Sequence, residues 1–407
     1  MKPNVISRLL FVVIAITTIT MAVGCGNDLY IIDADVNAVE TEQDITIEGF
    51  EYTYSEDRNA VQPSEKVWFR KTSRGILFMP NNAIMLVYNP EAGTLNTLCP
   101  DPLCPHQPYS GCPYGNCIFT NSIPAQYEDR LYYFVKDEYL HNEELIPNYI
   151  IYSTDLTGQK IEKHYETSEY MYGLTIVNGT AYFLENVRSN FNLLKAVDLD
   201  SGDVITISDE GFDRLMISSF ICMSDRIYYI LDNGKLYSCT FDLTDVRLEY
   251  DLQKPATYIY GRCDIGAIFW IYANVIYQFD TETQEVTELV SCDESLIIDK
   301  IINSEDGIYY QAFPKDTDYS SEYNEFAESI KDYNKLYKID PITKETGEYI
   351  LPDGFYLFSN TSIIIDNLLL TVTAVENPNT KTIVGRPFYA YDLETGSLHL
   401  LTEVSGS

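Results

Sequence analysis

The sequence predicts an all-β protein, a β-propeller of seven four-stranded blades. Two alternating motifs and an aromatic-rich composition support this prediction. Tyr makes up 34 of the 407 residues, with 18 Phe and only 2 Trp, and Tyr and Phe favour the pleated, half-buried surfaces of strands. The two motifs alternate strictly along the chain, so one repeat holds about four strands, the size of a propeller blade. Six or eight blades are the alternatives, because the strand-like segment 44–54 could add or close a blade.

The first motif is an apolar strand that ends in an Asn- or Asp-marked hairpin, as in LKAVDLDSGDVITI from Leu194. The Asn or Asp side chain accepts hydrogen bonds from backbone amides just ahead of it, and a following Gly adopts a positive φ at little cost. The aligned turn residues are Asn89, Asp155, Asp198, Asp242, Asp280, Asp340 and Asp392. The following glycines are Gly93, Gly158, Gly202, Gly347 and Gly396.

The second motif lies upstream of each hairpin and is a turn residue followed by an aromatic strand. Two copies read DRLYY from Asp129 and DRIYY from Asp225. The seventh copy, DNLLL from Asp366, lacks the aromatic residues. Together the two motifs place the propeller at residues 65–404.

The N-terminus has the pattern of an export signal. A basic start is followed by an apolar run of about 15 residues, short of the roughly 20 that a spanning helix needs. The run ends in AVGC, from Ala22 to Cys25. This order resembles a bacterial lipobox, in which the cysteine takes a diacylglycerol and becomes the mature N-terminus, although Ala22 stands where Leu or Val is more usual. A short transmembrane anchor is the alternative.

We therefore expect residues 1–24 to be a lipoprotein signal peptide and Cys25 to be the lipidation site. Residues 25–64 are acidic and are expected to form a tether. This organisation places the chain on the extracytoplasmic face of the cell membrane, held by its lipid anchor.

The net charge of the chain indicates which kinds of partner it is expected to bind. With 61 Asp and Glu against 27 Lys and Arg, the formal net charge is −34. Such a surface repels phosphate backbones and anionic headgroups, so nucleic acid is not an expected partner. The expected partners are an envelope protein, a glycan or a peptide.

Four long segments fall at connections that leave one face of the ring. Antiparallel strands reverse direction at each step, so second-to-third and blade-to-blade connections share a face. Elaboration of one face of a repeat protein is typical of its binding face, although exposed loops also vary without a function. The segments are 99–124, 137–148, 313–334 and 376–387. Tyrosines there are candidates for stacking on sugar or peptide: Tyr109, Tyr114, Tyr139, Tyr149, Tyr319, Tyr323 and Tyr333.

The first of these segments carries a cysteine cluster: Cys99, Cys104, Cys112 and Cys117, with His106 among them. A loop so rich in Pro and Gly has little secondary structure, and two disulfides would hold it together. A zinc site from Cys₄ or Cys₃His is the alternative, although the spacing lacks the usual C-x₂-C pair. Reactive thiols are a third interpretation.

No catalytic signature is present, and no catalytic residue is assigned. No histidine has a second histidine four residues away, and neither a Gly-x-Ser-x-Gly elbow nor a Walker loop occurs. The remaining cysteines are expected to be small buried apolar groups, because their strands lie too far apart for a disulfide. They are Cys222, Cys239, Cys263 and Cys292.

The lipobox, the Tyr-x-x-Asp-x-x-Thr-Gly hairpins and the Cys-Pro-Asp-Pro-x-Cys-x-His segment together resemble a group of bacterial lipoproteins. These proteins, seen in gut anaerobes, carry a receptor-related-protein-like β-propeller of unassigned function. The resemblance covers about residues 65–404. It implies an envelope protein and brings no known catalytic residues with it.

The leading functional hypothesis is a ligand- or protein-binding module outside the membrane. One alternative is an extracellular enzyme, a glycan or peptide hydrolase or lyase, with its site in the propeller mouth; a close carboxylate pair there would favour it. Another is an envelope assembly scaffold, which would show a flat apolar patch.

Overall fold

The computed structural model describes the strands and tight turns of an all-β chain. The described residues are 69–73, 75–78, 86–97, 124–141, 144–155, 160–188, 191–207, 217–252, 258–315, 333–352, 362–372, 375–376, 383–385 and 388–402. Within them, the one helical element is a single 3-10 turn, η2 (Cys263–Ile265). No helix of this described part is long and apolar enough to cross a membrane. The expected signal peptide, tether and segment 44–54 lie outside the described residues.

Seven four-stranded antiparallel sheets form the blades, and each takes its strands in order from one part of the chain. Blade 1 contains β1 (Phe69–Thr72), β2 (Gly75–Phe78), β3 (Leu86–Asn89) and β4 (Thr94–Thr97). Blade 2 contains β5 (Ala125–Tyr127), β6 (Arg130–His141), β7 (Glu144–Asp155) and β8 (Glu162–Thr167). Blade 3 contains β9 (Tyr170–Val177), β10 (Thr180–Arg188), β11 (Phe191–Asp198) and β12 (Val204–Thr206).

The remaining blades follow the same order. Blade 4 contains β13 (Ile217–Cys222), β14 (Ile227–Leu231), β15 (Lys235–Cys239) and β16 (Arg247–Asp251). Blade 5 contains β17 (Tyr260–Arg262), β18 (Ala267–Tyr272), β19 (Val275–Asp280) and β20 (Val286–Ser291). Blade 6 contains β21 (Leu296–Ser304), β22 (Gly307–Pro314), β23 (Lys335–Ile339) and β24 (Thr346–Ile350). Blade 7 contains β25 (Ser362–Ile365), β26 (Leu368–Val372), β29 (Phe388–Asp392) and β30 (Leu398–Thr402), with the hairpin β27 (Val375–Glu376) and β28 (Ile383–Gly385) inserted.

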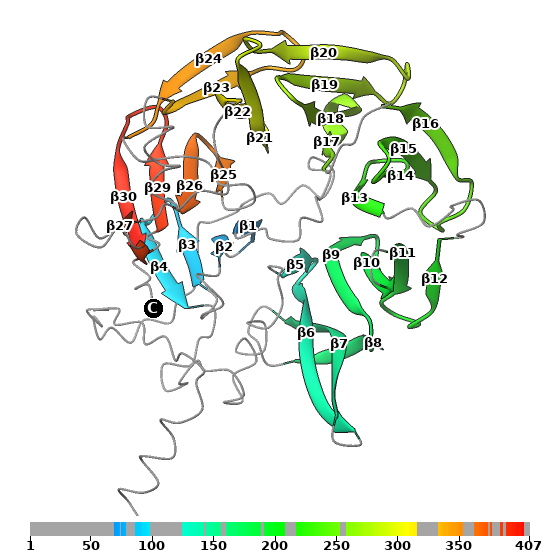
Figure 1. Ribbon diagram of the computed structural model, residues 1–407. Helices are drawn as coiled ribbons and strands as arrows, with labels where there is room; N and C mark the ends of the chain where they lie inside the picture. The colour runs from blue at the N-terminus through cyan, green and yellow to red at the C-terminus, as the bar shows by residue number, and fades with distance from the viewer. Residues whose placement is uncertain are drawn as a thin grey trace, which may run out of the picture.

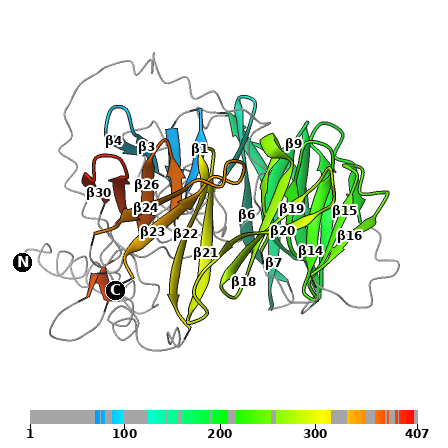
Figure 2. The same ribbon diagram turned by 90° about the horizontal axis from the view of Figure 1, so that it is seen from above.

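The blades are arranged in a ring, with the first strand of each blade toward the centre and the fourth strand outside (Figure 1). Seen from its edge, the ring shows its blades side by side, with strands that run between two opposite faces (Figure 2). The sequence-based prediction of seven four-stranded blades is therefore confirmed.

The core lies between the blades rather than within any one of them. Each apolar cluster joins two consecutive sheets; for example, Phe220 and Tyr229 of blade 4 pack with Tyr182 of blade 3. Because both faces of a sheet meet a neighbour, a second strand such as β14 is buried along its whole length. Ring closure uses the same contact, since Ile76 of blade 1 packs with Phe388 of blade 7. Many aromatic residues of these strands therefore pack in the core between neighbouring blades.

The third-to-fourth hairpins confirm the predicted turn chemistry. In five of them the marker side chain accepts hydrogen bonds from the amides two and three residues ahead: Asn89, Asp198, Asp280, Asp340 and Asp392. The residue four positions after the marker has a positive φ, as at Gly93, Gly202, Gln284, Lys344 and Gly396. The hairpin thus needs the marker side chain more strictly than it needs glycine.

Two details of the predicted turns are corrected. Gly347 is not the turn glycine of its hairpin, because it lies inside β24 and Lys344 adopts the positive φ of 64°. The hairpin at Asp242 has another form, in which the Thr244 amide donates to Asp242 and Leu243 and Asp245 both have positive φ. The turn after Asp155, with Gly158, lies outside the described residues.

A third correction concerns segment 137–148, which the sequence suggested was an inserted loop. Strands β6 and β7 run through most of it as a regular ladder, with Asp137 opposite Asn148 and His141 opposite Glu144. The segment therefore lengthens the second and third strands of blade 2 instead of forming a loop.

Candidate functional site

The described strands fix the face from which each long connection leaves. Those connections join β4 to β5, β22 to β23 and β26 to β29; the extended strands β6 and β7 are joined by only two residues, at the corresponding position of blade 2. Each is a second-to-third or a blade-to-blade connection, so all leave from the same face, as expected from strand direction. We call it the connection face. The opposite face holds the first-to-second and third-to-fourth turns, and we call it the turn face.

Tyr149 is the predicted ligand-face residue that the structure describes best. It lies toward the connection face on β7, half-buried, with its ring centroid 5.4 Å from that of Tyr170 at an interplanar angle of 84°. Tyr170, at the start of β9, stacks on Tyr172 at 5.8 Å and 27°. These three rings form an aromatic cluster where blades 2 and 3 meet.

The other sequence-predicted residues are less fully described. Tyr333 is half-buried just before β23. Tyr139 lies on β6 opposite Ile146. Outside the described residues lie the lipidation site, the cysteine cluster and four tyrosines, namely Cys25, Cys99, Cys104, His106, Cys112, Cys117, Tyr109, Tyr114, Tyr319 and Tyr323. The structure therefore brings together only Tyr149 and two tyrosines that the sequence had not singled out.

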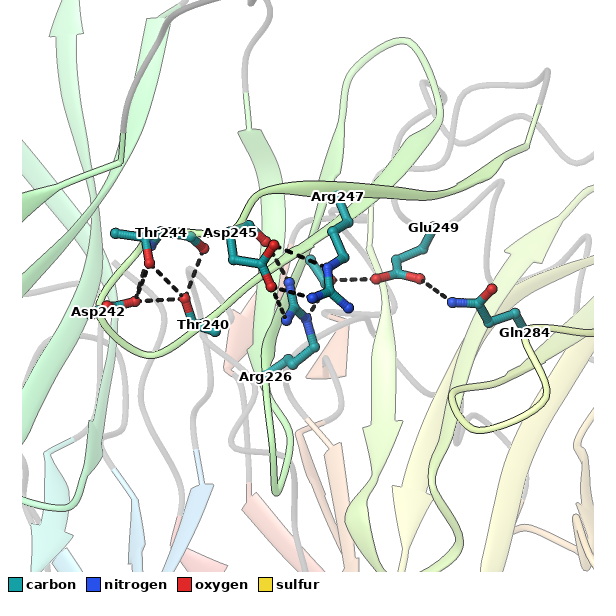
Figure 3. Close-up of polar contacts among 9 residues, drawn as sticks. Arg226, Thr240, Asp242, Thr244, Asp245, Arg247, Glu249 and Gln284 are labelled. Atoms are coloured by element: carbon teal, nitrogen blue, oxygen red, sulfur yellow. Dashed lines mark hydrogen bonds and ion pairs between the residues drawn. The ribbon is translucent and has the colours of Figure 1, made fainter.

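On the turn face, a polar chain runs across blade 4 to the next blade (Figure 3). The Arg226 guanidinium donates to Ser238 Oγ at 2.7 Å, and Ser238 donates to Glu249. Glu249 Oε2 then accepts from Gln284 Nε2 at 3.1 Å, in the third-to-fourth turn of blade 5. This series of hydrogen bonds thus links the start of β14 to the neighbouring blade 5.

Arg226 also binds the hairpin between the third and fourth strands of blade 4. Arg226 donates to Asp245 Oδ2 at 3.0 Å and to the Asp245 carbonyl at 2.6 Å. Arg247 donates to the same carboxylate from the solvent side. Hydrogen bonds from Arg247 and Arg226 lower the pKa of Asp245, so this carboxylate stays charged and acts as a structural acceptor.

Blade 2 repeats this arrangement with one change. Arg130 donates to Ser153 Oγ from Nε at 2.9 Å and from Nη2 at 2.6 Å. Ser153 Oγ lies 2.6 Å from His164 Nε2, and His164 Nδ1 lies 3.2 Å from the carbonyl of Leu199 in the blade 3 turn. Arginine, serine and a fourth-strand residue thus form an inter-blade brace in both blades, and we keep that name for the arrangement.

Further contacts join neighbouring blades. Lys344 Nζ, in the blade 6 turn, donates to Gln278 of blade 5 at 3.0 Å. Near the axis, Lys71 of blade 1 lies 3.8 Å from Glu305 and 4.0 Å from Asp366, which belong to blades 6 and 7. The carboxylates of Glu305 and Asp366 therefore share the ammonium group of Lys71, which links blade 1 to blades 6 and 7.

A buried ion pair lies between blades 2 and 3. Glu185 is 2 % exposed; it pairs with Lys195 and accepts from the Tyr165 hydroxyl at 3.0 Å. Burial alone would lower the pKa of Lys195, but its hydrogen bonds to Glu185 and Tyr165 raise it overall. Because Tyr165 comes from blade 2, the pair is a further inter-blade tie.

Metal-binding groups were sought among the same described residues, and no cluster of three or more His, Cys, Asp or Glu side chains there could hold a metal ion. No disulfide joins the cysteines in this part of the chain. Cys222 and Cys239 are buried as predicted, whereas Cys263 and Cys292 are half-buried. Burial raises the pKa of the Cys222 and Cys239 thiols, so both stay protonated.

The comparisons with known proteins support the fold alone. No family model matches the chain, and no curated protein matches its sequence. A puromycin hydrolase structure matches with a TM-score of 0.51 at 11% identity, over 86% of this chain and 55% of that one. An oligogalacturonate lyase from Vibrio parahaemolyticus gives 0.46 at 11%, over 67% and 86%, and a nidogen/laminin complex gives 0.39 at 11%, over 68% and 90%. The seven four-stranded sheets of the ring make the chain a seven-bladed β-propeller.

Proposed function

We propose that the chain is a membrane-anchored, extracytoplasmic lipoprotein whose propeller is a ligand- or protein-binding module, with the connection face as its binding surface. The observation that carries the proposal is the strand topology, because every long connection leaves from that one face. Long connections grouped on one face of a rigid scaffold are typical of binding surfaces.

Contacts on the turn face support this choice of surface. Arg226, Arg130 and Lys344 each contact protein acceptors, and the hairpin carboxylates accept backbone amides. Side chains that already hold the ring together are poorly placed to bind a partner, because binding would have to break those contacts. The turn face is therefore the scaffold side in this proposal.

The proposed ligand is a glycan or a peptide, or an envelope protein that presents one. Tyrosine offers a flat apolar face together with a hydroxyl, which suits stacking on a sugar ring or a peptide. Tyr149 and Tyr170, which are both half-buried, provide such rings at the connection face, whereas Tyr172 behind them is buried. The net charge of −34 disfavours nucleic acid and favours a neutral or cationic ligand.

Binding is tested with glycan and peptide arrays on the full-length chain in detergent. We expect a selective ligand whose affinity falls about tenfold or more in Tyr149→Ala, since aromatic anchors dominate such sites. The matched control is Tyr250→Ala, on the outer strand β16, which should bind like wild type. Equal loss in both variants, or the absence of any ligand, would contradict the proposed site. Cleavage of an arrayed compound would instead support the hydrolase or lyase alternative.

The anchor is the second part of the proposal and rests on the AVGC sequence that ends at Cys25. Two acyl chains give stable anchoring, since each buried CH₂ contributes about 0.8 kcal/mol. The resemblance of the sequence to bacterial lipoproteins with a receptor-related-protein-like propeller supports the same localisation. We expect a labelled fatty acid to mark wild type and Cys292→Ala, and to leave Cys25→Ala unlabelled. Equal labelling of all three proteins would refute the lipoprotein assignment.

A further inference from the structure

His164 occupies the position in blade 2 that Glu249 occupies in blade 4. Both are the unpaired residue of a β-bulge between the third and fourth strands. In blade 4 the register passes from Tyr237–Leu248 to Leu236–Tyr250, and in blade 2 from Tyr152–Lys163 to Ile151–Tyr165. A bulge re-aims the extra side chain, and here each extra side chain contacts the serine of its brace.

The hydrogen bonds of blade 2 define where the protons lie. His164 Nδ1 faces the Leu199 carbonyl at 3.2 Å, which can only accept, so Nδ1 carries the ring proton. Nε2 is then the acceptor for the Ser153 hydroxyl at 2.6 Å. Ser153 Oγ already accepts two N–H groups from Arg130. A hydroxyl has one proton and two lone pairs, so Ser153 has no capacity left for another donor.

We propose that His164 is an acid-sensitive joint between blades 2 and 3, closed when its imidazole is neutral and opened when Nε2 gains a proton. The added N–H points at a fully used hydroxyl, next to the Arg130 guanidinium. The ring must therefore turn or leave, and the hydrogen bond to Leu199 is lost with it. Blade 4 has no imidazole in its brace, because Glu249 stands at the same position.

The groups around His164 agree with this direction. Burial lowers the pKa of His164, while the bond to Leu199 and the nearby carboxylates Glu162 and Asp200 offset part of that effect, and Arg130 adds to it. The Tyr132 ring covers the imidazole at 5.4 Å. The unfolded or opened form therefore binds the proton more readily than the closed form. The contribution of the joint to stability is present above about pH 6.5 and falls as the pH drops below it.

Hydrogen exchange on the full-length chain at pH 7.5 and pH 5.5 tests the joint, after correction for intrinsic exchange rates. One unit below the ordinary histidine pKa, the opening equilibrium rises by at most about tenfold, the limit reached when the closed form binds no proton. We expect that loss of protection in residues 162–167 and 198–203. Residues 247–251 and 280–285, at the joint between blades 4 and 5, serve as the internal control and should change less than about twofold.

The variant His164→Gln removes the titrating group and keeps one acceptor and one donor. We expect its blade 2–blade 3 peptides to lose the acid response, whereas His399→Gln, on the exposed part of β30, should keep it. An unchanged response in His164→Gln would overturn the proposal. If that variant does not fold, the wild-type comparison decides: equal changes at the two joints would refute the inference. The result does not depend on the proposed binding function.

Discussion

Replacement of Arg226 by alanine tests whether the inter-blade brace stabilises the ring. The side chain is only 11 % exposed and donates to Ser238 at 2.7 Å, to the Asp245 carbonyl at 2.6 Å and to the Asp245 carboxylate at 3.0 Å. Hydrogen bonds that involve a charged group contribute about 1.5–3 kcal/mol each. The third bond adds little, because the Asp245 carboxylate is half exposed and screened by water. Water entering the vacated site offsets part of the loss, so we expect about 3 kcal/mol.

The assay is urea unfolding of the full-length chain, and the matched control is Arg247→Ala. Arg247 donates to the same Asp245 carboxylate but is 58 % exposed, so its loss should cost clearly less stability than the loss of Arg226. Arg226→Lys should fall between the two, since one ammonium cannot reproduce the planar fork. The reasoning would be refuted if Arg226→Ala cost no more than Arg247→Ala.

Three further predictions follow from the turns and the cysteines. Gly202→Ala should cost about 1 kcal/mol in urea unfolding, because φ is +75° and an added Cβ meets nothing within 4 Å, leaving only the backbone penalty; an unchanged midpoint would contradict this. Lys344→Gly should be about 1 kcal/mol more stable than Lys344→Ala, since both lose the bond to Gln278 and only glycine relieves the φ of 64°; the reverse order would count against it. For the cluster in segment 99–117, we expect native mass spectrometry to show one proton fewer per cysteine when disulfides form, or bound zinc removable by a chelator; freely alkylated thiols without metal would exclude both.

Local patterns predicted the blades and most of the turns. The alternation of aromatic strands and Asp-marked hairpins predicted seven blades, because each motif marks a defined pair of strands; the structure excluded the alternatives of six and eight. The hairpin at Asp340 shows the limit of this reasoning: Gly347 was the natural choice for positive φ, yet Lys344 adopts it. The marker side chain and the surrounding ladder impose the turn, and they force a non-glycine residue to accept the strain.

The inter-blade braces could not have been predicted in full. Two signals were visible, the repeated DR at the start of β6 and just before β14, and the serine in β7 and β15. The third member depends on a β-bulge, whose register shift no local pattern reveals. The partners Leu199 and Gln284 belong to the next blade, so they are identified only once the ring is built.

The tyrosine content predicted a β fold but identified only part of the aromatic cluster at the connection face. Tyr229 and Tyr309 are completely buried between blades, so much of the enrichment serves the core. Tyr149 was a candidate because of its position in a long connection, and the structure places it instead on the extended strand β7, against Tyr170. Only the contact between blades identified Tyr170 and Tyr172 as its neighbours.

The most direct test of the central claim is to map where a ligand from the arrays binds. Hydrogen exchange with and without that ligand, on the full-length chain, compares the two faces in one measurement. The proposal predicts protection at the strand ends of the connection face, in residues 144–149, 170–172 and 333–335, and no change in turn-face residues 198–203, 280–285 and 340–345. Protection confined to those turns would contradict the account, because it would put the ligand on the face assigned here to the scaffold.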